Sequence, residues 1–316
     1  MFPGALACFS QLNYLHVNAV FVNSNSLYEM AQICKDLNEL AIYDCTQDLP
    51  GLISLIDAQR NLKSLKIYHH GRKGNCNEIG KALARKGNTI NELHLVSVNT
   101  TIPLSFLTSL INLKKLSISN GENITEEIKK YLEISEFSEL QSLFVFGLSC
   151  FKELAILIEK TKGNISKIYI NITNKSVKNT EMLIKAIANN CPKIKELSTY
   201  LEPKDFIYVK SLLLNCRNLE SIKFDRLHFF VNENGRIGNE LLDILIKFSP
   251  KSFSIAISGD WKYSIDTFER FFESCRDRTL FRFDIVYYNQ FYITKDHKMI
   301  VRKYVDEGVV KHSNCK

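Results

Sequence analysis

The chain has 316 residues, of which 45% are hydrophobic and 24% are charged. These proportions are typical of a folded globular protein and exclude disorder over most of the chain, and no stretch of about 18 residues is apolar enough for a transmembrane helix. The net charge of +7 arises from residues 159–316. We interpret this bias as a solvated surface, and a face for acidic partners or nucleic acid is the open alternative.

Cysteine usage and the N-terminus bear on the compartment. The nine cysteines are scattered without C-x-x-C pairs. The apolar start, Met1–Cys8, has no positively charged region and is too short for a signal peptide. We therefore predict free thiols in a reducing compartment, which means a cytoplasmic or nuclear location.

One pattern, apolar-x-x-apolar-x-apolar, recurs along the chain and begins with Leu12-Asn-Tyr-Leu15-His-Val17. Its eleven copies follow one another at intervals of about 27 residues. They begin at Leu12, Leu37, Leu62, Ile90, Leu113, Leu140, Ile165, Ile194, Leu219, Ser252 and Leu280. A phase held over most of the chain indicates an internal repeat.

Each copy predicts one strand, and the segment ahead of it predicts one helix. The fourth and sixth residues of a copy are apolar between more polar neighbours, which is typical of a short strand with one buried face. Residues 26–34 and 180–189 place their apolar side chains on one helix face. Since neither element can bury its apolar face alone, we predict an α/β leucine-rich repeat solenoid, a horseshoe of about eleven helix–strand units with a concave parallel sheet.

The two ends of the predicted solenoid differ. We assign residues 1–291 to the repeats and residues 292–316 to a C-terminal capping helix and tail, because charged residues surround Met299, Ile300 and Tyr304 as a polar cap requires. The balanced charges of this helix argue against membrane binding. No cap precedes the first strand, so its open edge suggests missing upstream sequence.

Cysteines stand directly before three strands, as Cys34-Lys-Asp-Leu37, Cys191-Pro-Lys-Ile194 and Cys216-Arg-Asn-Leu219. The form Cys-x-x-apolar before a strand, together with the length of the repeat, resembles the cysteine-containing leucine-rich repeats typical of F-box proteins. Residues 30–35, 292–297 and 303–308 further resemble a large family of fungal F-box/leucine-rich repeat proteins. The resemblance implies a non-enzymatic interaction module, the substrate-recognition part of an F-box-type Skp–cullin ubiquitin ligase receptor.

Two features depart from the family pattern. The position eight residues after the first residue of a copy is usually Asn or Cys, and only Cys45 fits, which predicts an irregular solenoid. The F-box that precedes the repeats in the family is absent here, and the Leu-Pro segment at residues 48–56 lies in phase with the repeats as a helix between two copies. A Skp-family adaptor is therefore expected as a partner only if an upstream F-box exists. A free-standing scaffold or inhibitor unrelated to ubiquitin is the alternative.

No motif predicts catalysis, a metal site or a cofactor. The three cysteines before the strands occupy one equivalent position and are expected to be buried thiols, because no histidine is spaced to polarise them. His69, His70 and Cys76 lack a fourth zinc ligand, and we interpret Gly71–Gly74 beside them as a solvated loop after a strand.

Partner binding is predicted on the concave face, where the third, fifth and seventh residues of each copy point. The exposed aromatic residues expected there are Tyr43, Tyr68, Phe144, Phe146, Tyr169 and Tyr200. Such residues are typical anchors of protein interfaces, and the alternative is that they pack on one another or under loops. Mixed charges beside them favour an unknown protein partner or ubiquitination substrate, with no nucleic acid and no membrane expected.

Overall fold

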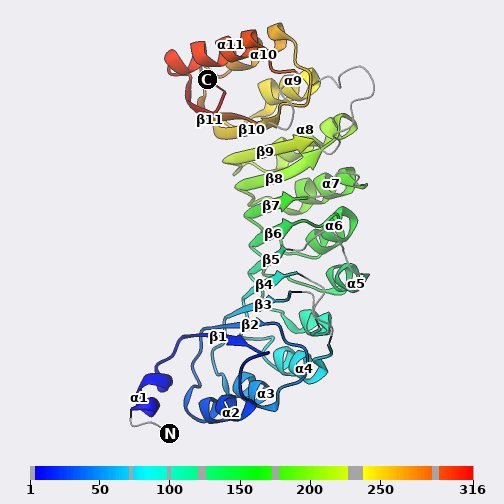
Figure 1. Cartoon of the computed structure of the whole chain (residues 1–316). Coiled ribbons are helices and arrows are strands. Elements are labelled where there is room, and N and C mark those ends of the chain that lie inside the picture. Colours follow the sequence, from blue (N-terminus) through cyan, green and yellow to red (C-terminus); the bar gives the residue numbers. More distant parts are fainter. Residues whose placement is uncertain are drawn as a thin grey trace. The chain divides into compact units, whose positions relative to one another are not determined.

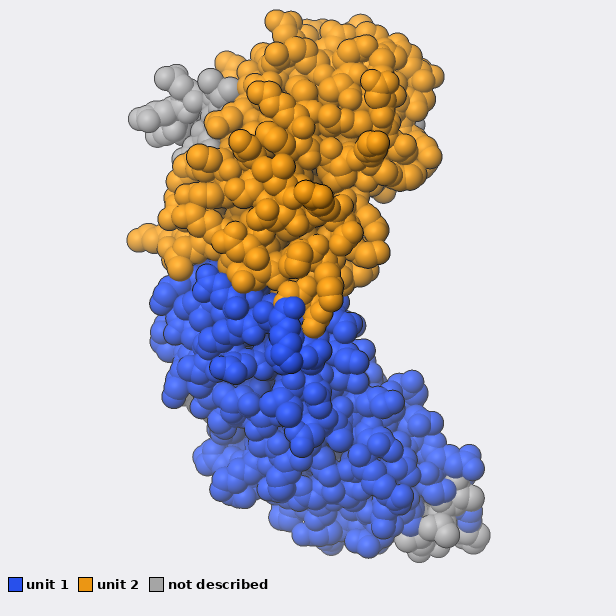
Figure 2. Space-filling model, turned by 180° about the vertical axis from the view of Figure 1, so that it is seen from behind, with its two compact units in different colours: residues 1–162 blue, residues 163–316 orange. Residues whose placement is uncertain are grey.

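The computed structural model describes residues 4–70, 74–97, 101–119, 126–172, 178–226, 238–286 and 292–315. The chain divides into two compact units, residues 1–162 and residues 163–316 (Figure 2). Each unit is a stack of alternating helices and strands in which the strands follow one another in chain order.

Unit 1 contains a parallel sheet in which each strand is hydrogen-bonded to the next strand along the chain (Figure 1). Its strands are Tyr14–Asn18 (β1), Glu39–Tyr43 (β2), Ser64–Tyr68 (β3), Glu92–Val96 (β4), Lys115–Ser119 (β5) and Ser142–Phe146 (β6). The helices are Ala5–Ser10 (α1), Ser24–Ile33 (α2), Pro50–Ala58 (α3), Asn77–Arg85 (α4), Leu104–Ser109 (η1), Glu126–Ile134 (α5) and Phe151–Glu159 (α6).

Unit 2 repeats this organisation with its own parallel pairs. Its strands are Lys167–Asn171 (β7), Glu196–Leu201 (β8), Ser221–Arg226 (β9), Ser252–Ser258 (β10), Thr279–Val286 (β11) and Val310–Ser313 (β12). The helices are Thr180–Asn190 (α7), Pro203–Asp205 (η2), Phe206–Asn215 (α8), Asn239–Phe248 (α9), Ile265–Glu273 (α10) and Lys295–Asp306 (α11). The helices of the described part are too short and too polar to cross a membrane.

The core of each unit lies between the sheet and its helices. In β2 and β3 the fourth and sixth residues of each copy pair across the strands, Leu40 with Leu65 and Ile42 with Ile67, and all four are buried. Burying an aliphatic side chain of this size contributes about 1.5–3 kcal/mol. The same two positions are filled in copy after copy, so each repeat supplies the missing half of its neighbour's core.

Close approach of neighbouring helices depends on Gly51, in the first turn of α3. A Cβ atom added there would lie 1.9 Å from the carbonyl oxygen of Ser24 in α2. The backbone N–H of Gly51 donates to the Ser24 hydroxyl at 2.8 Å. A larger residue would therefore force α2 and α3 apart.

A buried amide joins two consecutive repeats. Gln59, which follows α3, donates through Nε2 to the carbonyls of Cys34 and Leu55, both at 2.8 Å. Its Oε1 accepts from the N–H of Leu37 at 2.9 Å. The N–H of Gln59 itself reaches Ile56, so the Leu55 carbonyl, in the last turn of the helix, is satisfied by the side chain. The one amide caps its own helix and ties it to the preceding repeat.

The predicted α/β leucine-rich repeat architecture is confirmed. In the first seven copies the strand runs from the third to the seventh residue, and the helices predicted over residues 26–34, 48–56 and 180–189 correspond to α2, α3 and α7. The C-terminal helix expected over residues 293–307 is α11. The tail after it was not predicted to be ordered as a strand, yet β12 pairs in parallel with β11.

Candidate interaction surface on the sheet of unit 1

The parallel register of unit 1 arranges the outward-pointing residues into rows that cross the strands. The row of seventh positions sets Tyr43 beside Tyr68, and Val96 and Ser119 continue it to Phe146. Because the register is unbroken from β1 to β6, residues far apart in the sequence form one surface. We call this set of third, fifth and seventh residues of β1–β6 the sheet face.

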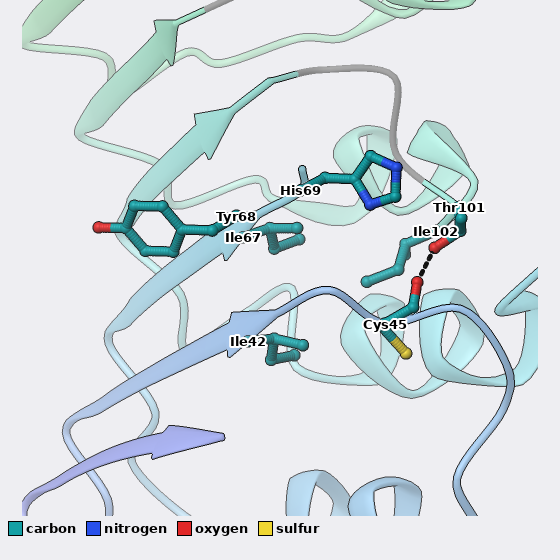
Figure 3. A pocket seen from close by; sticks show the side chains of 7 residues that line it. All are labelled: Ile42, Cys45, Ile67, Tyr68, His69, Thr101 and Ile102. Atoms are coloured by element: carbon teal, nitrogen blue, oxygen red, sulfur yellow. Dashed lines mark hydrogen bonds between the residues drawn. The ribbon is translucent and has the colours of Figure 1, made fainter. Parts of the chain in front are cut away.

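Two of the predicted anchors stack on each other. The rings of Tyr43 and Tyr68 lie 4.4 Å apart between centroids, with only 3° between their planes, and both side chains are half-buried. The ring of His16 lies 5.9 Å from that of Tyr43. Figure 3 shows the phenol of Tyr68 pointing to the opposite side of its strand from Ile67. Packing on one another thus accounts for part of their burial and leaves the rest of each ring at the surface.

A carboxylate organises the charges next to this stack. Glu39 accepts from Lys66 Nζ at 2.7 Å and from the Ser64 hydroxyl at 3.3 Å, and His16 Nε2 lies 3.8 Å away. Burial alone would raise the pKa of Glu39, but the hydrogen bonds and charge of Lys66, aided by Ser64, lower it below its usual range. The hydrogen bond with Glu39 also raises the pKa of Lys66. This ion pair is therefore fixed in its charged form at neutral pH.

A second group of charges lies one strand further along the sheet. Glu92 is 3.9 Å from His94 Nε2 and 3.7 Å from Lys115 Nζ. Burial, followed by the positive charges of Lys115 and Lys66, lowers the pKa of His94, so this imidazole is neutral at pH 7. The charged groups of the sheet face are therefore matched within the face itself.

Phe144 and Phe146 lie together on β6, as expected. The register places Ser117 of β5 beside Phe144 and Ser119 beside Phe146. Serine side chains are too short to cover a phenyl ring, and both phenylalanines are half-buried. These two rings therefore add to the tyrosine stack on the sheet face.

The two anchors predicted in unit 2 behave differently. Tyr169 is half-buried on β7. Tyr200 was expected to be exposed, and this was wrong, because its side chain is only 3% exposed. Its hydroxyl lies 3.4 Å from both Asn171 Oδ1 and the N–H of Ile172, at the end of β7. Alternation along a strand predicts to which side of the sheet a side chain points. It does not predict whether other groups cover the side chain there, as they cover the ring of Tyr200.

The aromatic set chosen from the sequence omitted Tyr14. This residue is the third position of β1 and is 62% exposed, more than any of the chosen aromatics. Further exposed apolar side chains of the first repeat are Phe9, Val20, Phe21 and Tyr28. The repeat pattern alone could have identified Tyr14 as a residue of this face, because Tyr14 and Glu39 are both the third residue of a copy and pair across β1 and β2.

A small recess opens at the carboxyl ends of β2 and β3 (Figure 3). It is lined by Ile42, Cys45, Ile67, Tyr68, His69, Thr101 and Ile102. Its empty volume is about 170 Å³ with the open mouth included, which is below the roughly 300 Å³ at which ligand pockets usually begin. The recess is thus too small for an organic cofactor.

His69, His70 and Cys76, which were considered as zinc ligands, do not form a metal site with a further ligand among the described residues. His70 is exposed and its Nδ1 lies 2.9 Å from Asp44 Oδ1. His69 is buried. Of the loop predicted over Gly71–Gly74, Gly74 is exposed, and residues 71–73 lie outside the described residues. Across the described ranges, no three metal-binding side chains converge.

The cysteines before the strands are buried, as predicted. Cys34, Cys191 and Cys216 are fully inaccessible free thiols. Burial raises the pKa of Cys216 to about 11 and also raises those of Cys34 and Cys191. Thiols of this kind are protonated at neutral pH and pack as small hydrophobic groups.

Comparison of the sequence with models of protein families and with curated proteins produced no match. The functional argument therefore depends on the repeat architecture and on the chemistry of the sheet face.

Proposed function

We propose that this chain is a non-enzymatic protein-interaction module that binds a protein partner through the sheet face of unit 1. The observation that carries the proposal is the stack of Tyr43 on Tyr68, in one row with Phe146. Half-buried aromatic rings on a broad face bury much apolar area on binding at little entropic cost, and such residues dominate the energetics of interfaces.

The charges of the face favour a protein over a nucleic acid as partner. Glu39 is paired with Lys66, and Glu92 lies between His94 and Lys115. A nucleic-acid surface needs lysines and arginines that are available to phosphates, whereas here the cations already have carboxylate partners. Charge pairs fixed in place instead supply orientation and selectivity around an aromatic centre.

The resemblance to F-box/leucine-rich repeat proteins supports a more specific role. In that role the chain is the substrate-recognition part of a Skp–cullin ubiquitin ligase receptor in the cytoplasm or nucleus, and it would need an F-box to dock on the adaptor. A free-standing scaffold or inhibitor is the alternative, and it uses the same face.

The test of the interaction proposal compares two double variants. Phe144→Ala with Phe146→Ala removes two rings from the sheet face, while Ile111→Ala with Ile134→Ala removes exposed apolar side chains outside the strands of the same unit. Proteins captured from the native cell by the wild type are quantified for each variant, and the purified partner is then titrated.

We expect the phenylalanine variant to lose about 2 kcal/mol or more of binding free energy, which is about a 30-fold rise in Kd. The isoleucine variant should bind as the wild type does. If the phenylalanine variant retains full affinity for every captured protein, the sheet face is not the binding surface.

The ligase role has its own test. A ubiquitination substrate should carry ubiquitin chains, and its half-life should lengthen when the phenylalanine variant replaces the wild type in cells. Mapping the 5′ end of the transcript should reveal an in-frame segment that encodes an F-box. A captured partner whose half-life is unchanged, together with a transcript that encodes no F-box, would favour the scaffold or inhibitor.

A further inference from the structure

Two cysteines from different repeats lie in contact in unit 1. The Sγ atoms of Cys45 and Cys76 are 3.1 Å apart and share a hydrogen bond. Cys45 follows β2, and Cys76 is the residue directly before α4. The neighbouring pair Cys191 and Cys216, equally buried in unit 2, is arranged differently, because the Cys216 thiol donates to the Cys191 carbonyl at 3.5 Å. Direct contact between sulfur atoms is thus not a general consequence of the repeat.

The backbone holds the two sulfur atoms together. The segments that carry them run side by side, with Gln47 paired to Asn75 in an isolated parallel bridge and the Asn75 N–H donating to the Thr46 carbonyl at 3.1 Å. A Cβ atom added to Gly74 would lie 2.0 Å from that same carbonyl oxygen. Only glycine allows this approach, so the sequence at position 74 is matched to the contact between the cysteines.

A third segment completes the site. The N–H of Cys76 donates to the Thr101 carbonyl at 2.9 Å, and the Thr101 hydroxyl lies 3.5 Å from Cys76 Sγ. The same hydroxyl donates to the Cys45 carbonyl, as Figure 3 shows. Cys45 also lines the small recess at the ends of β2 and β3, but the recess has no room for a molecule as large as water. An oxidant therefore reaches the pair when this part of unit 1 opens locally.

The two thiols differ in acidity. The hydrogen bond between Cys76 and Cys45 lowers the pKa of Cys76 against the opposing effect of burial, and Thr101 adds to the lowering. The same hydrogen bond and burial raise the pKa of Cys45. When one sulfur of the pair loses its proton, the other can donate a hydrogen bond to it across the 3.1 Å contact, which is the arrangement of an attacking and a resolving cysteine.

We infer that Cys45 and Cys76 form a redox-active pair that a hydroperoxide converts into a disulfide between two repeats. The Cys76 thiolate attacks one oxygen of hydrogen peroxide, the O–O bond breaks, and with one proton a water molecule leaves, which gives a sulfenic acid. The Cys45 sulfur then attacks Cys76 Sγ and loses its proton, the S–O bond breaks, and a second water leaves. Two thiols are oxidised by two electrons, and one peroxide is reduced to two waters. A dithiol reductant reverses the reaction.

The disulfide would connect the segment after β2 to the start of α4. Cys45 follows the strand that carries Tyr43, and Cys76 follows the strand that carries Tyr68 along the chain, so oxidation would link the segments that continue from these two strands. A cross-link of this kind restricts the unfolded chain and raises the unfolding midpoint.

Peptide mapping of the full chain tests the inference. The reduced protein is treated with hydrogen peroxide, remaining thiols are blocked with N-ethylmaleimide in denaturant, and a nonreducing digest is analysed by mass spectrometry. We expect a cross-linked peptide containing Cys45 and Cys76, lighter by about 2 Da than the sum of its reduced parts, that disappears on treatment with dithiothreitol. The oxidised protein should also unfold at a higher temperature than the reduced one.

Controls come from the chain itself. Cys45→Ala and Cys76→Ala should each abolish both the cross-link and the thermal shift, whereas Cys191→Ala should retain them. Recovery of Cys45 and Cys76 as maleimide adducts while the exposed thiol of Cys8 is oxidised would overturn the inference. A disulfide from either residue to another cysteine, or a sulfinic acid in place of the cross-link, would overturn it as well. The peptide map of the wild type decides the question by itself, so the test stands even if one of the variants fails to fold.

Discussion

Replacing Gln59 with methionine would remove three buried hydrogen bonds while keeping an unbranched side chain of nearly the same length. The amide of Gln59 donates to the Cys34 and Leu55 carbonyls and accepts from the Leu37 N–H. A methionine can fill the same space but offers none of these bonds. The substitution therefore separates the loss of hydrogen bonds from the loss of packing.

The magnitude follows from the groups left behind. Cys34 and Leu37 are fully inaccessible to solvent, so neither the carbonyl of one nor the N–H of the other can turn to water. A buried polar group that loses its partner destabilises a protein by about 1–3 kcal/mol. The Leu55 carbonyl, which is also inaccessible, loses its partner as well. Three such groups, offset by the apolar burial of methionine, give an expected loss of about 2–4 kcal/mol in the free energy of unfolding.

Urea unfolding followed by far-UV circular dichroism measures this loss. Gln32→Met, at an exposed position of α2, is the matched control and should change stability by less than about 0.5 kcal/mol. Gln59→Glu keeps the acceptor, loses both donors and buries a charge, so it should destabilise at least as much as Gln59→Met at neutral pH. If Gln59→Met unfolds within about 0.5 kcal/mol of the wild type, the amide does not stabilise the stack.

Three further outcomes are expected. Gly51→Ala should lower stability by about 1–3 kcal/mol, since its Cβ would meet the Ser24 carbonyl; wild-type urea unfolding would contradict this. Burial lowers the pKa of His297, so the unfolded chain takes up the proton first and stability falls as pH drops below about 6.5. His297→Asn should therefore lose less Tm than the wild type between about pH 7 and pH 5, and equal losses would exclude this role. Lys66→Met should raise the pKa of Glu39 in an NMR titration, and an unchanged pKa would show that Lys66 does not hold it low.

Regular parts of the fold could be predicted because their signal is local. The alternation of apolar and polar residues in Leu37–Tyr43 predicts which residues of β2 face the core. Its repetition along the chain predicts that the strands lie side by side in parallel. β12 carries no such signal, because Val310-Lys-His-Ser313 has a single apolar residue. Its place in the sheet is set by pairing with β11 after α11 has turned the chain, which is a tertiary effect.

The sheet face was predictable in direction but not in exposure. The repeat phase correctly pointed Tyr43 and Tyr68 outward, yet it could not show that their rings stack or that Tyr200 is covered. The contact between Cys45 and Cys76 was also beyond the sequence. It joins residues 31 positions apart and depends on a close backbone approach at Gly74 that no local pattern encodes.

The strand β12 has a consequence for how the protein behaves in a crowded cell. It ends the sheet of unit 2 with only four residues, and both Lys311 and His312 on it are exposed. An unpaired strand edge invites strands from other molecules, and a short edge with a charged lysine discourages them. The short β12 with its exposed lysine thus disfavours the addition of strands from other molecules, which counters the growth of fibres from a protein built of parallel strands.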